Sequence, residues 1–187
     1  MNYTTANRFG AFGTPNRTGV LGTPNQTAAA QSPGRDSPTE NLARLNLALP
    51  LPAEPEGSHV PWRLAGNMLF LSGVPPRHPN GIVTFGKVGQ ALTIDQGYEA
   101  AKLCGLNLLV NMRAALGSLD RVDTVLKVFG MINAAPNFIE HPKIIDGCTD
   151  LFVQVFGDNG RPARSAIGMG SLPGNVSVEI EAIVLVK

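Results

Sequence analysis

The sequence predicts an α+β domain in which two helices pack on one face of a single sheet. Three observations indicate this class: short apolar segments that alternate with a period of two, two longer segments with helical end signals, and turn sequences between them. In chain order these segments read β-β-α-β-α-β-β. The predicted core of roughly 130 residues is long enough to bury about two-thirds of the surface that its unfolded chain exposes.

The first half of the predicted domain contains two strands and a long helix. Asn67–Gly73 (NMLFLSG) is a short apolar strand, and Ile82–Val88 is a weaker one that follows the turn sequence PPRHPNG. Thr93–Leu116 is predicted to be helical, because its first residue and the glutamine three positions later have the spacing of a capping box. Gly117 stands where a left-handed C-cap belongs. Apolar residues cover more than one stripe of this helix, so we expect it to be broadly buried.

The second half contains a strand, a helix and two further strands. Val122–Ile132 is rich in β-branched residues and alternates as a strand does. A second helix begins at His141, has proline at its next position, and ends at Gly157. The turn sequence SLPGN joins Ala163–Gly170 to Val176–Val186. If that turn makes a hairpin, the beginning of one strand lies near the end of the other.

Residues 1–45 differ in composition from the domain at 46–187. They are rich in Gly, Thr, Asn, Pro and Ala and contain the near-repeat GTPNRT and GTPNQT. Too few bulky apolar side chains are present to offset the entropy of ordering, so we predict a disordered tail. Three arginines and no acidic residue before Asp36 also resemble an organelle transit segment, although Gly and Pro suit an amphipathic helix poorly. Asn41–Leu49 has the character of a short helical turn.

Charge and cysteine usage exclude several function classes. Charged residues make up 16% of the chain and the formal net charge is +1, with no Lys/Arg cluster. This argues against nucleic acid and anionic membrane surfaces as partners, and the apolar surplus favours self-association. Cys104 and Cys148 lack the spacing of a zinc site or a disulfide framework. No membrane-span run or secretory signal is evident, so we expect a soluble intracellular protein, cytoplasmic or mitochondrial.

The last predicted strand carries two carboxylates on a half-apolar face. Period two places Glu179 and Glu181 together with Ile183 and Leu185, opposite the all-apolar face that should pack under the helices. Burying unpaired carboxylates costs several kcal/mol or shifts their pKa values, so a cation is expected nearby in a cleft or subunit interface. Arg164, at the beginning of the preceding strand, is the candidate. It need not face Glu179 within one chain, because a neighbouring subunit could supply the match.

These residues carry a resemblance. PARSAIGMGSLPGNVSVEIEAIVLV resembles the carboxy-terminal signature of the Rid family of reactive-intermediate deaminases, also called the YjgF or L-PSP family, with its pattern P-A-R-S, a short strand, L-P and V-E-I-E-A. GNMLFLSG resembles the first core strand of that family. FGKVGQALTIDQGYEAAKLCGLNLLVNMRAALGSLDRV and DLFVQVFG resemble its longer bacterial and eukaryotic subgroup. The similarity runs in one continuous order over about Leu51–Lys187.

The resemblance implies a chorismate-mutase-like fold with a mixed sheet, assembled as a homotrimer that has a small-molecule pocket at each subunit interface. It implies hydrolysis of 2-imino or 2-enamino acids to 2-oxo acids and ammonia, as in 2-iminobutanoate/2-iminopropanoate deaminases, without metal or organic cofactor. Arg164 would bind the substrate carboxylate, for which its fork of donors is suited. Glu179 would place or deprotonate the attacking water. Ser72 and Gly73 would form the pocket edge, and Ala166 stands where some members have cysteine, a change that a backbone carbonyl contact would survive.

Two departures from the family pattern concern substrate choice. His59 stands where the family often has tyrosine, and Asp146 stands in the second helix where asparagine is common. The same pocket could therefore serve a non-catalytic binder of 2-oxo acids or amino acids. A ribonuclease or translation inhibitor is disfavoured, because phosphate contacts normally dominate RNA affinity and this chain lacks a basic stripe.

Each site residue also has a structural alternative. Arg164 and Glu179 could belong to interface ion pairs, and Glu181 is assigned to structure. Ser165 has no evident base, which argues against a hydrolase triad. No glycine pattern of a phosphate-binding loop is found, so no nucleotide cofactor is expected.

Overall fold

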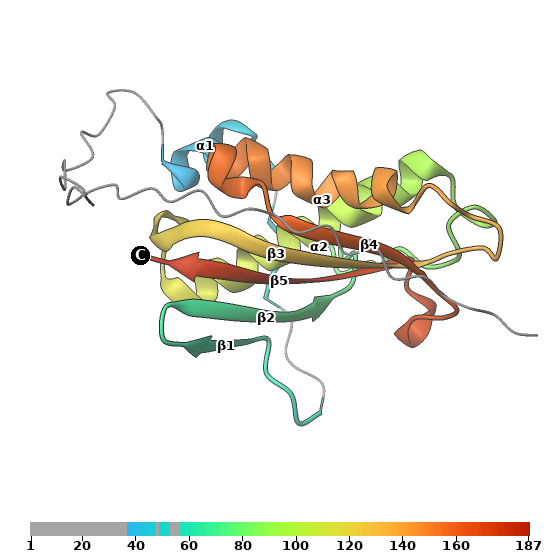
Figure 1. The fold of residues 1–187 in the computed structure, drawn as a ribbon, viewed down its shortest axis with the longest axis horizontal. Coiled ribbons are helices and arrows are strands. Elements are labelled where there is room, and N and C mark those ends of the chain that lie inside the picture. Colours follow the sequence, from blue (N-terminus) through green and yellow to red (C-terminus); the bar gives the residue numbers. More distant parts are fainter. Residues whose placement is uncertain (1–36, 48, 53–56) are drawn as a thin grey trace, which may run out of the picture. The chain divides into compact units, whose positions relative to one another are not determined.

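A five-stranded sheet forms the centre of the domain in the computed structural model, which describes residues 37–47, 49–52 and 57–187 (Figure 1). The strand order is β1-β2-β5-β3-β4. The strands and helices are β1 (Trp62–Ala65), β2 (Met68–Val74), β3 (Val122–Asn133), β4 (Ala163–Met169), β5 (Val178–Val186), α1 (Pro38–Arg44), α2 (Ile94–Leu116) and α3 (His141–Phe156). Short 3-10 turns span Leu119–Arg121, Gly157–Gly160 and Pro173–Asn175. The predicted α+β class is confirmed.

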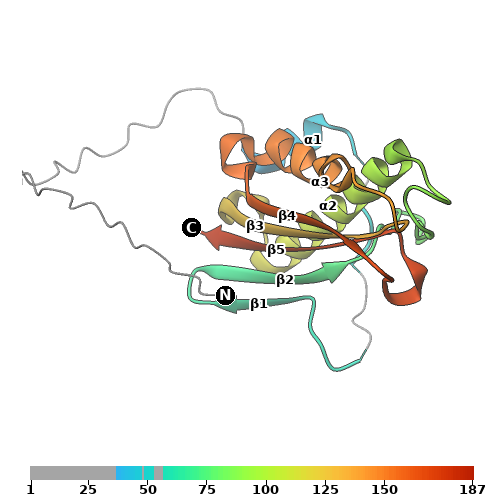
Figure 2. The same ribbon diagram turned by 45° about the vertical axis from the view of Figure 1, so that its right-hand side comes forward.

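The two long helices lie together on one face of the sheet (Figures 1 and 2). Thr93 caps α2 in the predicted capping box with Gln96, and Gly117 ends it with φ 80°. Both helices are heavily buried because α2 packs against the sheet and against α3. Gly147 of α3 permits the close helix–helix approach, since a Cβ there would overlap the carbonyl oxygen of Tyr98.

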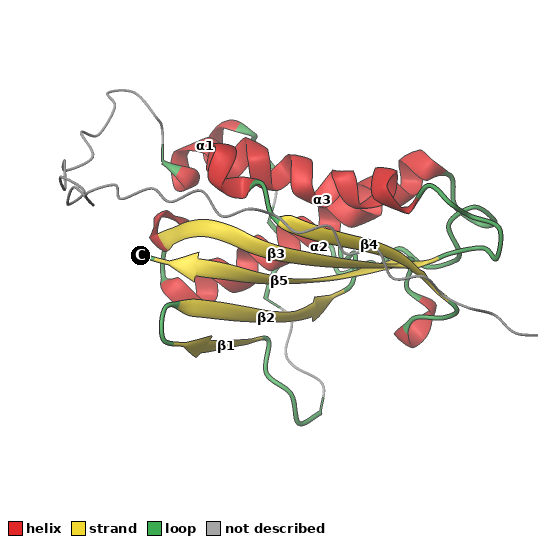
Figure 3. Cartoon of the chain, in the orientation of Figure 1, coloured by secondary structure: helices red, strands yellow, loops and turns green. Residues whose placement is uncertain are grey.

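The predicted order β-β-α-β-α-β-β is found after α1, but the first strand is β1, which was not predicted, and the predicted strand Asn67–Gly73 is the second, β2. β1 and β2 form a hairpin whose two-residue loop contains Gly66 at φ 60°. The predicted strand at Ile82–Val88 is wrong, because this segment makes only isolated bridges such as Phe85 with Val176. Gly81 and Gly86, with φ of 86° and 108°, turn the chain there and prevent a continuous ladder (green loop in Figure 3).

The last two strands do not form a hairpin. β3 lies between them, parallel to β4 and antiparallel to β5, so that Val128 pairs with Arg164 on one side and Ala182 on the other. The crossover through α3 returns the chain beside β3 in the parallel direction, and β5 then enters the centre of the sheet between β2 and β3. In this central position both edges of β5 are hydrogen-bonded, and its apolar face lies under the helices.

The alternation predicted for β5 is confirmed. Ile180 and Val184 are fully buried under the helices, whereas Glu179 and Ile183 lie on the opposite face. Among the described residues no helix or strand covers that opposite face, which we call the open face. Its exposed apolar side chains include Met68, Phe70 and Ile167. An apolar sheet face of this kind favours contact with another protein surface.

The predicted tail at residues 1–45 falls largely outside the described residues. Its end forms α1, so the short helical turn lies slightly earlier than the predicted Asn41–Leu49. Leu42 is buried, and the Asn41 side chain donates to the carbonyl of Val155 at 2.9 Å. These contacts attach α1 to α3.

Candidate functional site

The two predicted charged site residues lie on opposite faces of the sheet. Glu179 alternates with the buried Ile180 and therefore points to the open face. Arg164 points to the helix face, because its Nη1 donates to Asp146 Oδ1 at 2.6 Å and to Thr149 Oγ1 at 3.0 Å, both on α3. The two side chains do not meet within one chain.

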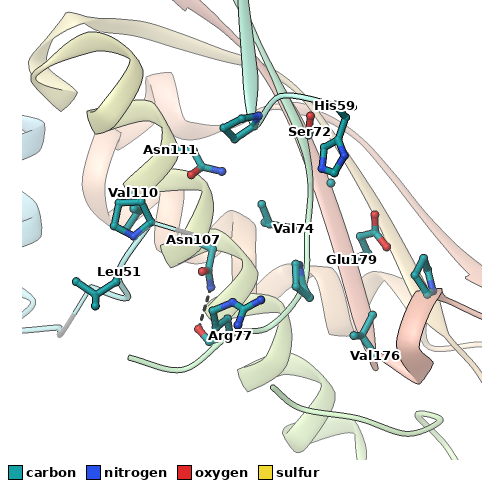
Figure 4. Close-up of a pocket in the computed structure, with 15 residues that line it drawn as sticks. Leu51, His59, Ser72, Val74, Arg77, Asn107, Val110, Asn111, Val176 and Glu179 are labelled. Atoms are coloured by element: carbon teal, nitrogen blue, oxygen red, sulfur yellow. Dashed lines mark hydrogen bonds between the residues drawn. The ribbon is translucent and has the colours of Figure 1, made fainter. Parts of the chain in front are cut away.

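Glu179 lines a cavity of about 340 Å³ together with Ser72 and Gly73 (Figure 4). Ser72 is held against the preceding segment, since its Oγ donates to the carbonyl of Val60 at 2.6 Å and its amide to that of Pro61 at 3.1 Å. Position 73 requires glycine, because the Glu179 carboxylate lies so close that a Cβ at this position would overlap it. Three predicted site residues are thus brought together, with the predicted departure His59 in the same lining.

Electrostatics make the Glu179 carboxylate a better base than an ordinary glutamate. Burial raises its pKa, and the negative charge of Glu181 raises it further. A carboxylate with a raised pKa accepts a proton more readily near neutral pH. No cation lies close enough to form an ion pair with Glu179 among the described residues. Arg164, the cation predicted near it, therefore does not lie beside Glu179 in the same chain.

The wall of the cavity opposite Glu179 contains polar residues that the sequence analysis did not single out. α2 supplies Asn107 and Asn111 on this side, and the loop after β2 supplies Arg77 (Figure 4). Asn107 Nδ2 donates to the carbonyls of Arg77 and Leu103 at 2.9 and 2.8 Å. The available signal was a pair of asparagines one helical turn apart in the apolar stretch LNLLVNM.

The Arg164 region forms a second, smaller group on α3 and β4. The side chains of Arg164 and Asp146 are 24% and 44% exposed, so this ion pair is accessible from solvent. Among the described residues, both side-chain hydrogen bonds of Arg164 come from Nη1, which leaves Nε and Nη2 for a further partner. Ala166 packs against the core on the same strand. The Asp146 departure from the family pattern is therefore in direct contact with the proposed anchor.

Other predicted residues take structural positions. His78 is hydrogen-bonded to Thr84 Oγ1 at 3.2 Å within its turn, and Ser165 Oγ accepts from Lys127 Nζ at 2.8 Å. Cys104 and Cys148 are buried thiols whose pKa values burial raises. Across the described ranges no group of His, Cys, Asp and Glu is arranged to hold a metal ion. None of the helices in these ranges has the length and apolarity needed to cross a bilayer.

Known proteins resemble this chain over most of the described domain. Residues 40–182 match the family described as "YjgF/chorismate mutase-like, putative endoribonuclease". The chain is 39% identical over 145 residues to Protein TCP17 of Trypanosoma cruzi, a match that covers 77% of this chain and 91% of that protein. It is 31% identical over 144 residues to the 2-iminobutanoate/2-iminopropanoate deaminase of Dermatophagoides farinae, covering 75% and 95%. The crystal structure of "a putative endoribonuclease" from Shewanella oneidensis MR-1 superposes with a TM-score of 0.78 at 30% identity, covering 81% of this chain and 100% of that one.

Proposed function

This chain belongs to the YjgF/RidA family, and on that premise we propose that it hydrolyses reactive 2-imino acids to 2-oxo acids and ammonia at sites between subunits. One observation carries the proposal. Arg164 and Glu179 stand on opposite faces of the sheet, so a site that uses both is complete only when a second copy contributes one of them.

The open face supplies a reason for the copies to associate. Its exposed apolar side chains Phe70 and Ile167 are better covered than solvated, and covering them brings the Glu179 cavity of one copy to the edge of another. Arg164 is on the edge strand β4 of that second copy. A closed ring of three copies satisfies this head-to-tail arrangement, because each subunit then gives one half-site and receives the other.

The chemistry follows from the two half-sites. The free guanidinium donors of Arg164 bind the substrate carboxylate. The Ser72–Gly73 edge and the Ala166 backbone confine the remainder of the substrate. Water adds to the C=N carbon of the protonated imine while Glu179 takes one of its protons, which gives a neutral tetrahedral amino alcohol. The same carboxylate returns this proton to nitrogen. It then accepts the hydroxyl proton as the C=O bond forms and the C–N bond breaks, and the products are a 2-oxo acid and ammonia. No electron transfer is needed, so no redox partner enters the balance.

A coupled assay tests the proposal. A threonine dehydratase generates 2-iminobutanoate while semicarbazide traps the imine that remains, and light scattering measures the mass of the assembly. We expect faster imine loss with the wild-type chain and the mass of three copies. A monomer, or an unchanged rate of imine loss, would contradict the proposed hydrolysis.

The second candidate function is a binder of 2-oxo acids or amino acids that does not turn them over. The Arg164 donors that Asp146 leaves free support it, because they can bind a carboxylate whether or not Glu179 lies beside it. Arg164-dependent binding of 2-oxobutanoate by calorimetry, without acceleration of imine loss, would select this function.

A further inference from the structure

The cavity beside Glu179 contains a cation that the proposed reaction does not use. Arg77 belongs to the loop after β2 and lines the cavity opposite the catalytic carboxylate. Among the described residues, its guanidinium makes no hydrogen bond and no ion pair. The side chain is only partly exposed, so the charge is neither matched by the domain nor fully surrounded by water.

Asn111 provides an independent indication that this wall binds something. Its residue is 7% exposed, and within the described ranges its side-chain amide has no hydrogen-bond partner. Figure 4 shows it extending from α2 toward the middle of the cavity. Its nitrogen and oxygen are not sealed from solvent, since no buried side-chain N or O atom of the described residues lacks a partner. An amide that opens into a cavity with both groups unpaired is available to a ligand there.

The backbone that carries Arg77 is fixed in place. Its carbonyl accepts from Asn107 of α2 at 2.9 Å, and its amide donates to the carbonyl of Pro75 at 2.9 Å. The residue also makes an isolated bridge with Val83. These bonds fix the point of the backbone from which the Arg77 side chain extends along the cavity.

From these contacts we propose that Arg77 and Asn111 bind a second carboxylate, carried on the side chain of the substrate, so that the site selects dicarboxylic 2-imino acids. The inference rests on the proposed function and names its substrate class. The first carboxylate binds Arg164 of the neighbouring copy, the imine carbon lies at Glu179, and the side chain extends along Val74 and Val110 to Arg77.

Charge and size favour a second carboxylate over an apolar group. An apolar substituent would leave the Asn111 amide unpaired and would desolvate Arg77 without compensation. A carboxylate accepts from both, as charge-assisted bonds that are roughly twice as strong as neutral ones. The volume of about 340 Å³ is within the range of small-molecule sites and exceeds the need of a four-carbon acid.

The test compares two imines on matched variants. Amino-acid oxidases generate 2-iminobutanoate or 2-iminoglutarate in situ, and semicarbazide traps the remainder. Arg77→Met should lower kcat/KM for 2-iminoglutarate about 10- to 100-fold, the range for loss of one charged hydrogen-bonded pair, and should leave 2-iminobutanoate within about threefold. Asn111→Leu should show a smaller loss of the same selectivity. Arg113→Met is the control, because Arg113 is an exposed arginine of α2 outside this cavity.

The outcomes separate this inference from the proposed function. Equal losses on both imines, or no loss on either, would overturn the second-carboxylate site while leaving the hydrolysis established. If the wild-type chain accelerates neither imine, calorimetry with 2-oxoglutarate and 2-oxobutanoate decides: tighter binding of 2-oxoglutarate that Arg77→Met abolishes supports the site. Absent or Arg77-independent binding of 2-oxoglutarate overturns it. Unchanged thermal unfolding of each variant shows that the fold is retained.

Discussion

Two arginines of this domain, Arg164 and Arg77, differ in what their guanidinium groups contact. Arg164 is paired with Asp146 and Thr149 on the helix face, whereas Arg77 lines the cavity without a partner among the described residues. The paired arginine belongs to a sequence motif, and the other stands in an irregular loop. The guanidinium that the motif suggests as an anchor is therefore already partly paired, whereas the guanidinium across the cavity from Glu179 has no partner among the described residues.

Among the variants that test the different roles of these two arginines, Arg164→Ala should have the largest effect. We expect loss of at least about 100-fold in kcat/KM on both the monocarboxylic and the dicarboxylic imine, since the first carboxylate is common to both. Arg77→Met should affect only the second. The control is Arg161→Ala, an exposed arginine three residues earlier whose ion pair with Asp158 lies at the surface.

The assembly distinguishes an anchor from a structural arginine. Size-exclusion chromatography with light scattering should give the same mass for Arg164→Ala and the wild type. If the variant dissociates to monomers, Arg164 holds subunits together and the anchoring role is wrong.

Removing the partner of Arg164 should have an intermediate effect. Asp146→Asn keeps an acceptor oxygen for Nη1 but removes the negative charge, so carboxylates compete less with the protein for the guanidinium. Because this pair is partly solvent-exposed, the gain is about 1 kcal/mol or less, or up to roughly fivefold tighter binding of 2-oxobutanoate by calorimetry. Asp150→Asn, on the same helix and bonded to Tyr98, is the matched control and should leave binding unchanged. Weaker binding by Asp146→Asn would show that Asp146 positions the anchor rather than competing for it.

The contrast between the two arginines also explains what the sequence could predict. Strands, helices and caps follow from local patterns, so α2 with its capping box and the buried alternation of β5 were correctly predicted. The placement of β3 between β4 and β5 depends on which strand edges remain unpaired after α3, and this is a long-range outcome that no local turn signal encodes. For that reason the SLPGN turn suggests a hairpin of the last two strands, which the structure does not contain.

The site residues likewise divide into those that sequence motifs predict and those that only the fold brings to the cavity. Gly73 and Glu179 belong to motifs and do meet in the structure. Arg77 and Asn111 line one cavity only because the loop after β2 folds back on α2, where Asn107 holds it. Nothing in the spacing of Arg77 and Asn111 in the sequence indicates that they share a cavity.

The smallest expected effect on activity comes from the charge of Glu181 beside Glu179. The pKa of Glu179 is raised by burial and by the charge of Glu181, so its base form is lost at a higher pH than for an ordinary glutamate as the pH falls. The acid limb of kcat should follow this raised pKa. Glu181→Gln removes only the charge contribution and should move that limb slightly to lower pH, because Glu181 is exposed and screened.

The raised pKa of Glu179 also makes the free energy of unfolding depend on pH. The sign of this dependence is opposite to that for a carboxylate in a salt bridge. Since the folded-state pKa is raised, protonated Glu179 favours the fold, and this contribution is present at low pH and lost as the pH rises through the raised value. Glu179→Gln should therefore unfold at a higher temperature than the wild type at neutral pH and at about the same temperature at pH 4, while kcat falls about 100-fold or more. Equal stability at both pH values would mean that an unrecognised cation, supplied by a neighbouring copy, compensates the carboxylate. In that case Arg164 of the second subunit would pair with Glu179 directly, and the interface would contain an ion pair in place of a substrate site.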